Sequence, residues 1–181
     1  MDALNSAKGS PTSRSSLGKL TSRGANAQTT INSVSEPVSL STDMWLNLRD
    51  LATAEITSED VDHPIESALI PGRGPGWRAA KPGKQTIRLV FDEPMSIQRI
   101  LPRFEERERG RTQEFALRWV SQGLSHREIV RQQYVFSPPA TIQELEDYSV
   151  KLSGVIALEL QIVPDISGGG AYASLAEMRL G

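Results

Sequence analysis

The chain has 181 residues, of which 38% are hydrophobic and 23% are charged, and its 20 Lys and Arg against 22 Asp and Glu give a net charge of −2. A protein that binds nucleic acid mainly through bulk positive charge is therefore not expected. The chain has no Cys and only two His, which excludes disulfides, Cys-ligated zinc and thiol catalysis and argues against a multi-His metal site.

The first 40 residues contain no aromatic side chain and are rich in Ser and Thr. Such a segment cannot bury enough apolar surface to offset the entropy lost on ordering. We therefore predict a disordered Ser/Thr-rich tail at 1–40 and a folded domain at 41–181. The N-terminus lacks the continuous apolar region of a secretory signal, and no stretch approaches the roughly 20 apolar residues that span a bilayer. We expect a cytoplasmic location and no membrane span.

Three segments of the predicted domain, 86–91, 113–119 and 155–163, alternate between apolar and polar side chains. A period of two is typical of a half-buried strand. The apolar faces carry Ile87, Leu89 and Phe91 in the first, Phe115, Leu117 and Trp119 in the second, and Ile156, Leu158, Leu160 and Ile162 in the third.

Weaker strands are predicted at 53–57, 96–104, 127–136 and 173–180, with short helical turns at 45–51 and 64–70. Many short strands separated by turns, without convincing amphipathic helices, predict an all-β fold, an antiparallel sandwich. Glu and Arg alternate through 103–111, which we interpret as the solvated, self-neutralising tip of a hairpin between the strands on either side.

A Gly-rich loop runs from Ile70 to Trp77, and two prolines remove backbone N–H donors that a phosphate-binding loop needs. The loop and the residues after it carry Arg73, Trp77, Arg78 and Lys81. An aromatic platform beside polar groups suits a sugar, which has an apolar face and a polar rim. The alternative is that Trp77 begins a strand and fills one end of the sandwich.

Two further segments carry side chains that could bind a metal ion or catalyse a reaction. Asp60 and Asp62 lie in a turn-like acidic loop and offer oxygen ligands for Ca²⁺, although the sequence favours a plain turn over a metal site. Ser125 and His126 are adjacent, but neighbouring residues on a strand point to opposite faces, which is wrong for a nucleophile and its base. No catalytic constellation is found, so we predict that the chain is not an enzyme.

The stretch from Asn47 to the end resembles the discoidin-like, galactose-binding-like domains, which include coagulation-factor type C domains and many carbohydrate-binding modules. The matching segments are 52–58, 65–69 with the Gly-rich loop up to Trp77, 83–91 and 173–180. The resemblance implies a jelly-roll sandwich that binds ligand with loops at one end. It also implies a structural Ca²⁺, since Glu177 matches a closing-strand Glu that supports this ion. No other cofactor is expected.

Two functions follow. The first is a non-catalytic module that binds a glycan or similar polar ligand through Arg73, Trp77, Arg78 and Lys81. The second is a protein-interaction domain, because segment 77–87 is also similar to the N-terminal domain of the DNA single-strand-break-repair scaffold. Its candidate surface is the outer sheet face with Arg88, Glu114, Arg118, Glu159 and Gln161, where cross-strand charge pairing is the competing explanation. The oligomeric state stays open.

Overall fold

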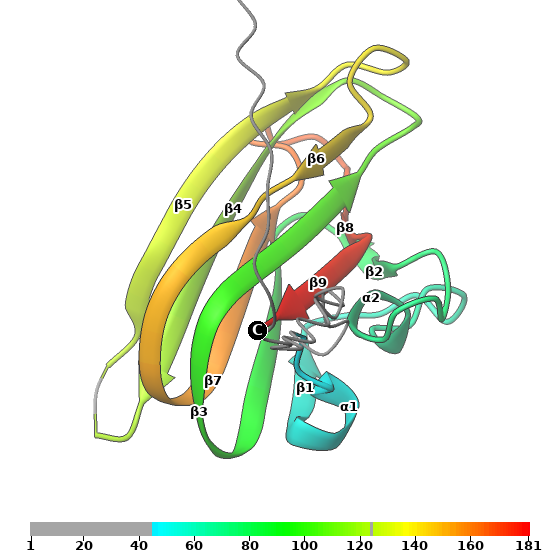
Figure 1. Cartoon of the computed structure of the whole chain (residues 1–181). Helices are drawn as coiled ribbons and strands as arrows, with labels where there is room; N and C mark the ends of the chain where they lie inside the picture. Colours follow the sequence, from blue (N-terminus) through cyan, green and yellow to red (C-terminus); the bar gives the residue numbers. More distant parts are fainter. Residues whose placement is uncertain (1–44, 124) are drawn as a thin grey trace, which may run out of the picture. The chain divides into compact units, whose positions relative to one another are not determined.

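In the computed structural model, which describes residues 45–123 and 125–181, strands dominate the chain (Figure 1). The predicted tail at 1–40 lies outside the described residues. The elements are α1 Leu48–Leu51, β1 Ala52–Ile56, α2 Glu66–Leu69, β2 Trp77–Pro82, β3 Gln85–Glu105, β4 Arg111–Ser121, β5 Arg127–Phe136, β6 Gln143–Leu145, β7 Tyr148–Val163, β8 Tyr172–Leu175 and β9 Glu177–Leu180. No helix among these residues has the length and apolar content needed to cross a membrane.

The long strands β3 and β7 bend together and fold one sheet into two layers (Figure 1). In one layer β1, the first half of β3, the second half of β7, β4 and β5 are neighbours, all antiparallel. In the other, β9 and β6 pair with the second half of β3, beside the start of β7. The architecture is the antiparallel β-sandwich that the sequence predicts.

The bend explains why one predicted turn is a strand. The sequence predicts separate strands at 86–91 and 96–104, but β3 continues through Asp92–Pro94 between them. The pairing with β7 shifts register between Val90 and Met95, so the extra residues bulge outward and stay exposed. A proline at a bulge loses no ladder hydrogen bond, and a bulge lets a strand bend without ending.

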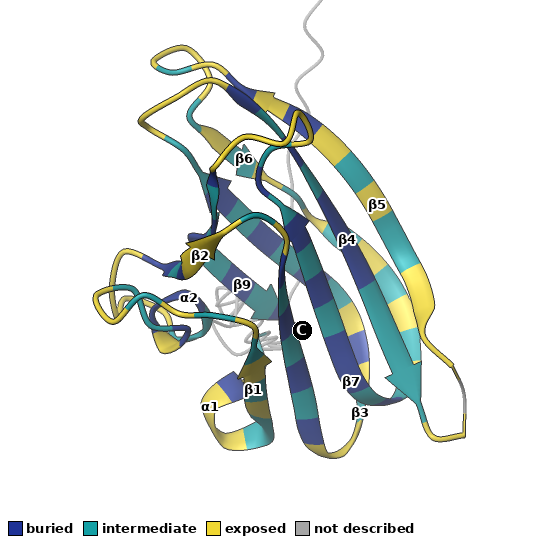
Figure 2. Ribbon diagram, turned by 180° about the vertical axis from the view of Figure 1, so that it is seen from behind, coloured by how far each residue is buried: buried dark blue, intermediate teal, exposed yellow. Residues whose placement is uncertain are grey.

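The core confirms most of the predicted strand faces. Ile87, Leu89 and Phe91 of β3 and Leu158, Leu160 and Ile162 of β7 are buried. Figure 2 shows buried and less buried positions alternating along both strands. The alternation in β7 fails at one place, because Ile156 is half-exposed while Ala157 is buried. That place lies beside the bulge, where an irregular register moves side chains to the opposite face.

The C-terminal segment forms two strands rather than the single strand predicted at 173–180. β8 pairs with β2 in a separate two-stranded sheet, whereas β9 pairs with β3. Between β8 and β9, Ala176 donates its backbone N–H to the carbonyl of Arg103 (2.8 Å). At this residue the chain passes from the two-stranded sheet to the large sheet. The small β2–β8 sheet therefore covers one end of the sandwich.

Candidate functional site

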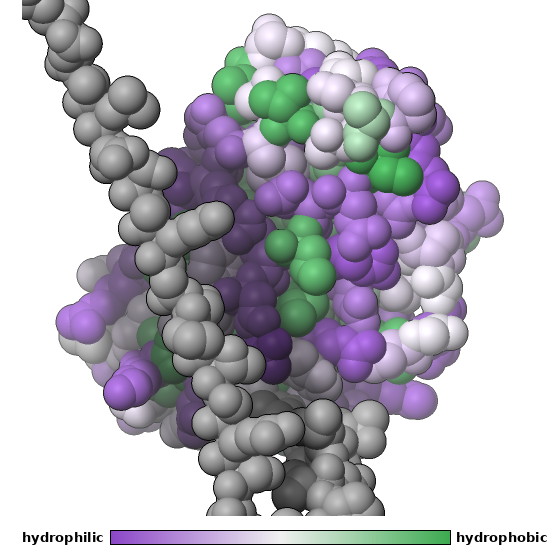
Figure 3. Space-filling view, turned by 45° about the horizontal axis from the view of Figure 1, so that its top comes forward, coloured by the Kyte–Doolittle hydropathy of each residue, from purple (hydrophilic) through white to green (hydrophobic). Residues whose placement is uncertain are grey.

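A cavity of about 490 Å³ lies at the end of the sandwich where β3 ends and β4 begins. Its walls come from segment 105–111, from the start of β2 with His63 beside it, and from segment 171–176. Gly181 lies beside the second half of β3, where it donates its N–H to the carbonyl of Arg99 (3.0 Å). We call this hollow the Trp77 cavity. Most of the surface visible in Figure 3 is hydrophilic, with apolar groups in small patches.

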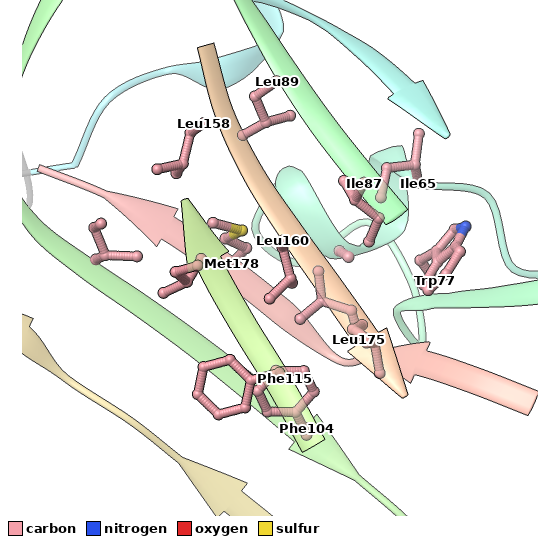
Figure 4. Close-up of a cluster of buried hydrophobic side chains, with 14 of the residues drawn as sticks. Ile65, Trp77, Ile87, Leu89, Phe104, Phe115, Leu158, Leu160, Leu175 and Met178 are labelled. Atoms are coloured by element: carbon pink, nitrogen blue, oxygen red, sulfur yellow. The ribbon is translucent and has the colours of Figure 1, made fainter. Parts of the chain in front are cut away.

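Trp77 forms part of the inner wall of the cavity and is only 1% exposed. Its ring belongs to the buried core, and the ring nitrogen lies at the outer end of the side chain in Figure 4. That nitrogen is buried and has no hydrogen-bond partner among the described residues. A buried N–H without a partner costs about 1–3 kcal/mol, and Trp77 Nε1 is such a donor in a residue that lines the cavity.

Arg78 and Tyr172 form a second wall. The Arg78 guanidinium lies over the Tyr172 ring, 5.3 Å from its centroid. Strands β2 and β8, which carry these two residues, are held in register by pairing of Arg78 with Ser174. The backbone of Arg78 also accepts from Asp60 N–H (2.9 Å) and donates to His63 O (3.2 Å), which fixes the 58–64 loop against the cavity.

Arg111 forms a third, rigid wall. Its side chain is 1% exposed, and Nη1 donates to the carbonyls of Pro164 (2.8 Å) and Tyr172 (3.2 Å). Its Nε lies 2.7 Å from a carboxylate oxygen of Glu106. Burial lowers the pKa of Arg111 and the Glu106 charge opposes that shift, so the guanidinium stays ionised. The other Glu106 oxygen accepts the backbone N–H groups of Glu108 (2.7 Å) and Arg109 (3.3 Å), which fixes the loop.

Solved structures with the same architecture include carbohydrate-binding modules. The family 32 module of AlyQ, in complex with 4,5-unsaturated mannuronic acid, matches with a TM-score of 0.54 and 14% identity over 73% of this chain and 95% of that one. A family 32 module from C. perfringens NanJ, in complex with galactose, matches with a TM-score of 0.53 and 16% identity over 76% and 97%. A pectin-binding module matches with a TM-score of 0.54 and 15% identity over 72% and 90%.

The chain has the galactose-binding-like fold. The predicted resemblance to discoidin-like domains is thereby confirmed at the level of the fold. No protein-family model and no curated protein matches the sequence.

The galactose-binding-like sandwich separates the four side chains predicted to bind ligand. Trp77 and Arg78 line the Trp77 cavity. Arg73 instead lines a smaller hollow of about 280 Å³ beside α1 and α2. Lys81 is exposed near the end of β2 and does not line the cavity, and its carbonyl accepts from Gln85 (3.0 Å).

The three carboxylates predicted to hold Ca²⁺ are not brought together. Asp60 accepts the backbone N–H of Asp62 (2.9 Å), as in a plain turn. Glu177 accepts from Arg103 (3.4 Å) and Arg179 (2.6 Å), so two guanidinium groups occupy its oxygens. Within residues 45–123 and 125–181, no three His, Asp or Glu side chains are grouped closely enough to hold a metal ion. These residues do not fit the ion that the resemblance implies.

The prediction that the charged run at 103–111 forms the tip of a hairpin is wrong. Strand β7 lies between β3 and β4 in the sheet order, so β3 and β4 share no pairing and the segment between them crosses the end of the sandwich. It therefore contributes a buried cation, Arg111, and its carboxylate partner Glu106 to the cavity. Sequence reasoning missed both of these residues and Tyr172. The local sequence carries no signal for them, because their burial depends on strand order.

The second predicted surface, the outer sheet face, consists of charges that pair with each other. Arg88 donates to Glu55 (2.8 Å), and Arg118 donates to Glu159 (3.1 Å). Glu114 accepts from Arg131 (2.6 Å), and its pKa is lowered by the hydrogen bonds from Gln133 and Arg131. Cross-strand pairing accounts for these residues without a partner protein.

Proposed function

We propose that the chain is a carbohydrate-binding module that holds a saccharide in the Trp77 cavity without transforming it. The observation that carries the proposal is the unpaired Trp77 Nε1 in the wall of a cavity whose other side chains are mostly polar. Small-molecule sites are commonly concave spaces of roughly 300–1,000 Å³ in which a few polar groups orient the ligand. The cavity, at about 490 Å³, falls in that range.

The structural neighbours support the proposal. One neighbour is solved with galactose, another with an unsaturated mannuronic acid, and a third is a pectin-binding module. A fold alone does not determine a ligand, so the argument for this chain depends on its own cavity. A hydroxyl or carboxylate oxygen of a saccharide would accept the indole N–H that the protein leaves unpaired.

The test is a comparison of Trp77→Phe with Trp119→Phe, using the full chain on an array of galactosides, mannuronides and galacturonides. Phenylalanine keeps a buried aromatic ring and removes the donor, and it leaves a smaller cavity in the core than alanine would. Loss of one hydrogen bond should weaken binding about 3–10-fold for Trp77→Phe, and a cooperative melting curve should show that the variant is folded.

Trp119→Phe is the control, because Trp119 is a partly buried tryptophan that packs against the core near Arg127 and does not line the cavity. It should leave binding unchanged. If Trp77→Phe binds as tightly as the unmodified chain, the site lies elsewhere. If no saccharide on the array is bound, or if the chain releases reducing ends from a bound one, the proposal of a non-catalytic module is wrong.

A further inference from the structure

The carboxylates at the Trp77 cavity are mostly engaged already. Glu105 pairs with Arg103 (3.4 Å) and with Arg107. Glu106 pairs with Arg111 and accepts two backbone N–H groups. Among residues 45–123 and 125–181, the one lining carboxylate without such a partner is that of Glu108, which is exposed on the loop. The inner wall therefore offers few vacant acceptors.

Two guanidinium groups of the cavity lining, unlike most of its carboxylates, have no ion-pair partner among the described residues. Within the described part of the chain, neither Arg78 nor Arg109 has a carboxylate at ion-pair distance. Arg78 is nevertheless held in place, because its guanidinium packs on Tyr172 at 5.3 Å and its backbone is bonded on both sides to the 58–64 loop. Its donors are thus positioned but not paired with a carboxylate.

The groups of the lining that can only donate and have no carboxylate partner within residues 45–123 and 125–181 are Trp77 Nε1 and the guanidinium groups of Arg78 and Arg109. His63 Nδ1 and the Tyr172 hydroxyl, by contrast, can each donate or accept. A neutral sugar hydroxyl needs to donate as well as accept, whereas a carboxylate only accepts and matches a guanidinium fork in two-point geometry. An excess of donors therefore favours an anionic ligand.

We infer that the saccharide bound in the Trp77 cavity is acidic and that Arg78, with Arg109 as a second cation, binds its carboxylate. This inference rests on the proposed function and adds the ligand class. Bulk electrostatics would not produce the same preference, because the whole chain carries a net charge of −2 and repels polyanions.

The experiment is affinity electrophoresis of the full chain in native gels containing polygalacturonate, polymannuronate or polyglucuronate. Each is compared with the neutral polymer of the parent sugar: galactan, mannan or glucan. Salt at about 0.15 M screens distant charges beyond roughly 8 Å. At least one acidic polymer should bind about tenfold or more tightly than its neutral counterpart, and Arg78→Gln should weaken that binding by about tenfold or more, since hydrogen bonds between charged partners are the strong ones.

Arg127→Gln is the matched control, because Arg127 also lies over an aromatic ring, Trp119 at 5.9 Å, but does not line the cavity. It should leave the affinity within about twofold of the unmodified chain, as is usual for an exposed charge. Arg78→Lys keeps the charge and loses the fork, so it should bind more weakly than the unmodified chain. Melting curves of all variants establish that they are folded.

Each other outcome overturns a defined part of the argument. If neutral polymers bind as well as acidic ones, or if Arg78→Gln binds normally, the acidic ligand is wrong and the saccharide-binding function stands. If Arg78→Gln and Arg127→Gln weaken binding equally, the attraction is general electrostatics and the inference fails. If no polymer, acidic or neutral, retards the chain, the proposed function fails together with it.

Discussion

At the scale of single residues, Gly76 determines where Trp77 lies. Its φ of +101° belongs to the region that favours glycine. A Cβ at this position would lie 2.5 Å from the carbonyl oxygen of Leu175 and 2.7 Å from Cα of Ala176, both backbone atoms. The chain can therefore enter β2 this close to β8 and β9 only without a side chain. The buried position of Trp77 and the closed inner wall of the cavity follow from that approach.

Replacing Gly76 by alanine should be more destabilising than the same change at Gly72. Gly72 also has a positive φ, of 72°, but a Cβ there meets nothing within 4 Å. Gly72→Ala should therefore cost only the conformational penalty, about 1–2 kcal/mol. Gly76→Ala carries the same penalty plus displacement of the backbone. Urea denaturation of the two variants measures the difference in the free energy of unfolding, and equal losses would show that the approach of β2 is not tight.

At the scale of elements, the side chains that β7 directs into the core determine how the two layers pack. Leu158 is fully buried against the core, whereas Ile156, two residues earlier, is half-exposed because of the bulge opposite β3. Leu158→Ala should lower the free energy of unfolding by about 2–5 kcal/mol, as a core truncation does. Ile156→Ala should lower it by less than half as much. Equal effects in chemical denaturation would mean that the register of β7 is wrong.

Polar side chains fill the side of the sandwich between β5 and β6, which do not pair with each other. Glu144 lies opposite Phe104 in the β6–β3 pairing, so its side chain shares the inward face with that buried ring. Next to it Glu146 accepts from Gln132 of β5, which in turn accepts from the Tyr148 hydroxyl (2.8 Å). Burial raises the pKa of Glu144, and the neighbouring Glu146 carboxylate raises it further.

This raised pKa makes the stability depend on pH in a defined direction. The folded chain holds the Glu144 proton to higher pH than the unfolded chain does, so its contribution is lost as pH rises above the ordinary Glu pKa of about 4.3. Glu144→Gln should match the unmodified chain near pH 4 and be more stable near pH 7. Glu93→Gln, on the exposed bend of β3, is the control for removing one charge. A difference in unfolding free energy that stays constant from pH 4 to pH 8 would contradict the effect.

At the scale of the whole molecule, the sequence was sufficient for the fold but not for the complete site. Alternation in 86–91 and 155–163 directly records which side chains face the core, so the sandwich could be predicted from it. Trp77 and Arg78 could be found because they lie together in one loop. Arg111 and Tyr172 could not, since they reach the cavity only when β7 separates β3 from β4 and β8 pairs with β2. Local pattern does not encode that order of strands.

The shared bend of β3 and β7 also bears on how the protein meets a ligand. Because both strands pass from one layer into the other, the layers are joined by two continuous backbones as well as by apolar contact, and the two strands pair with each other in both layers. Moving the layers apart would require both strands to straighten at the bend, so the spacing between the layers is set when the chain folds. A ligand of the kind proposed above would therefore meet a cavity that folding has already shaped, and the entropy of ordering its walls would be lost during folding rather than during association.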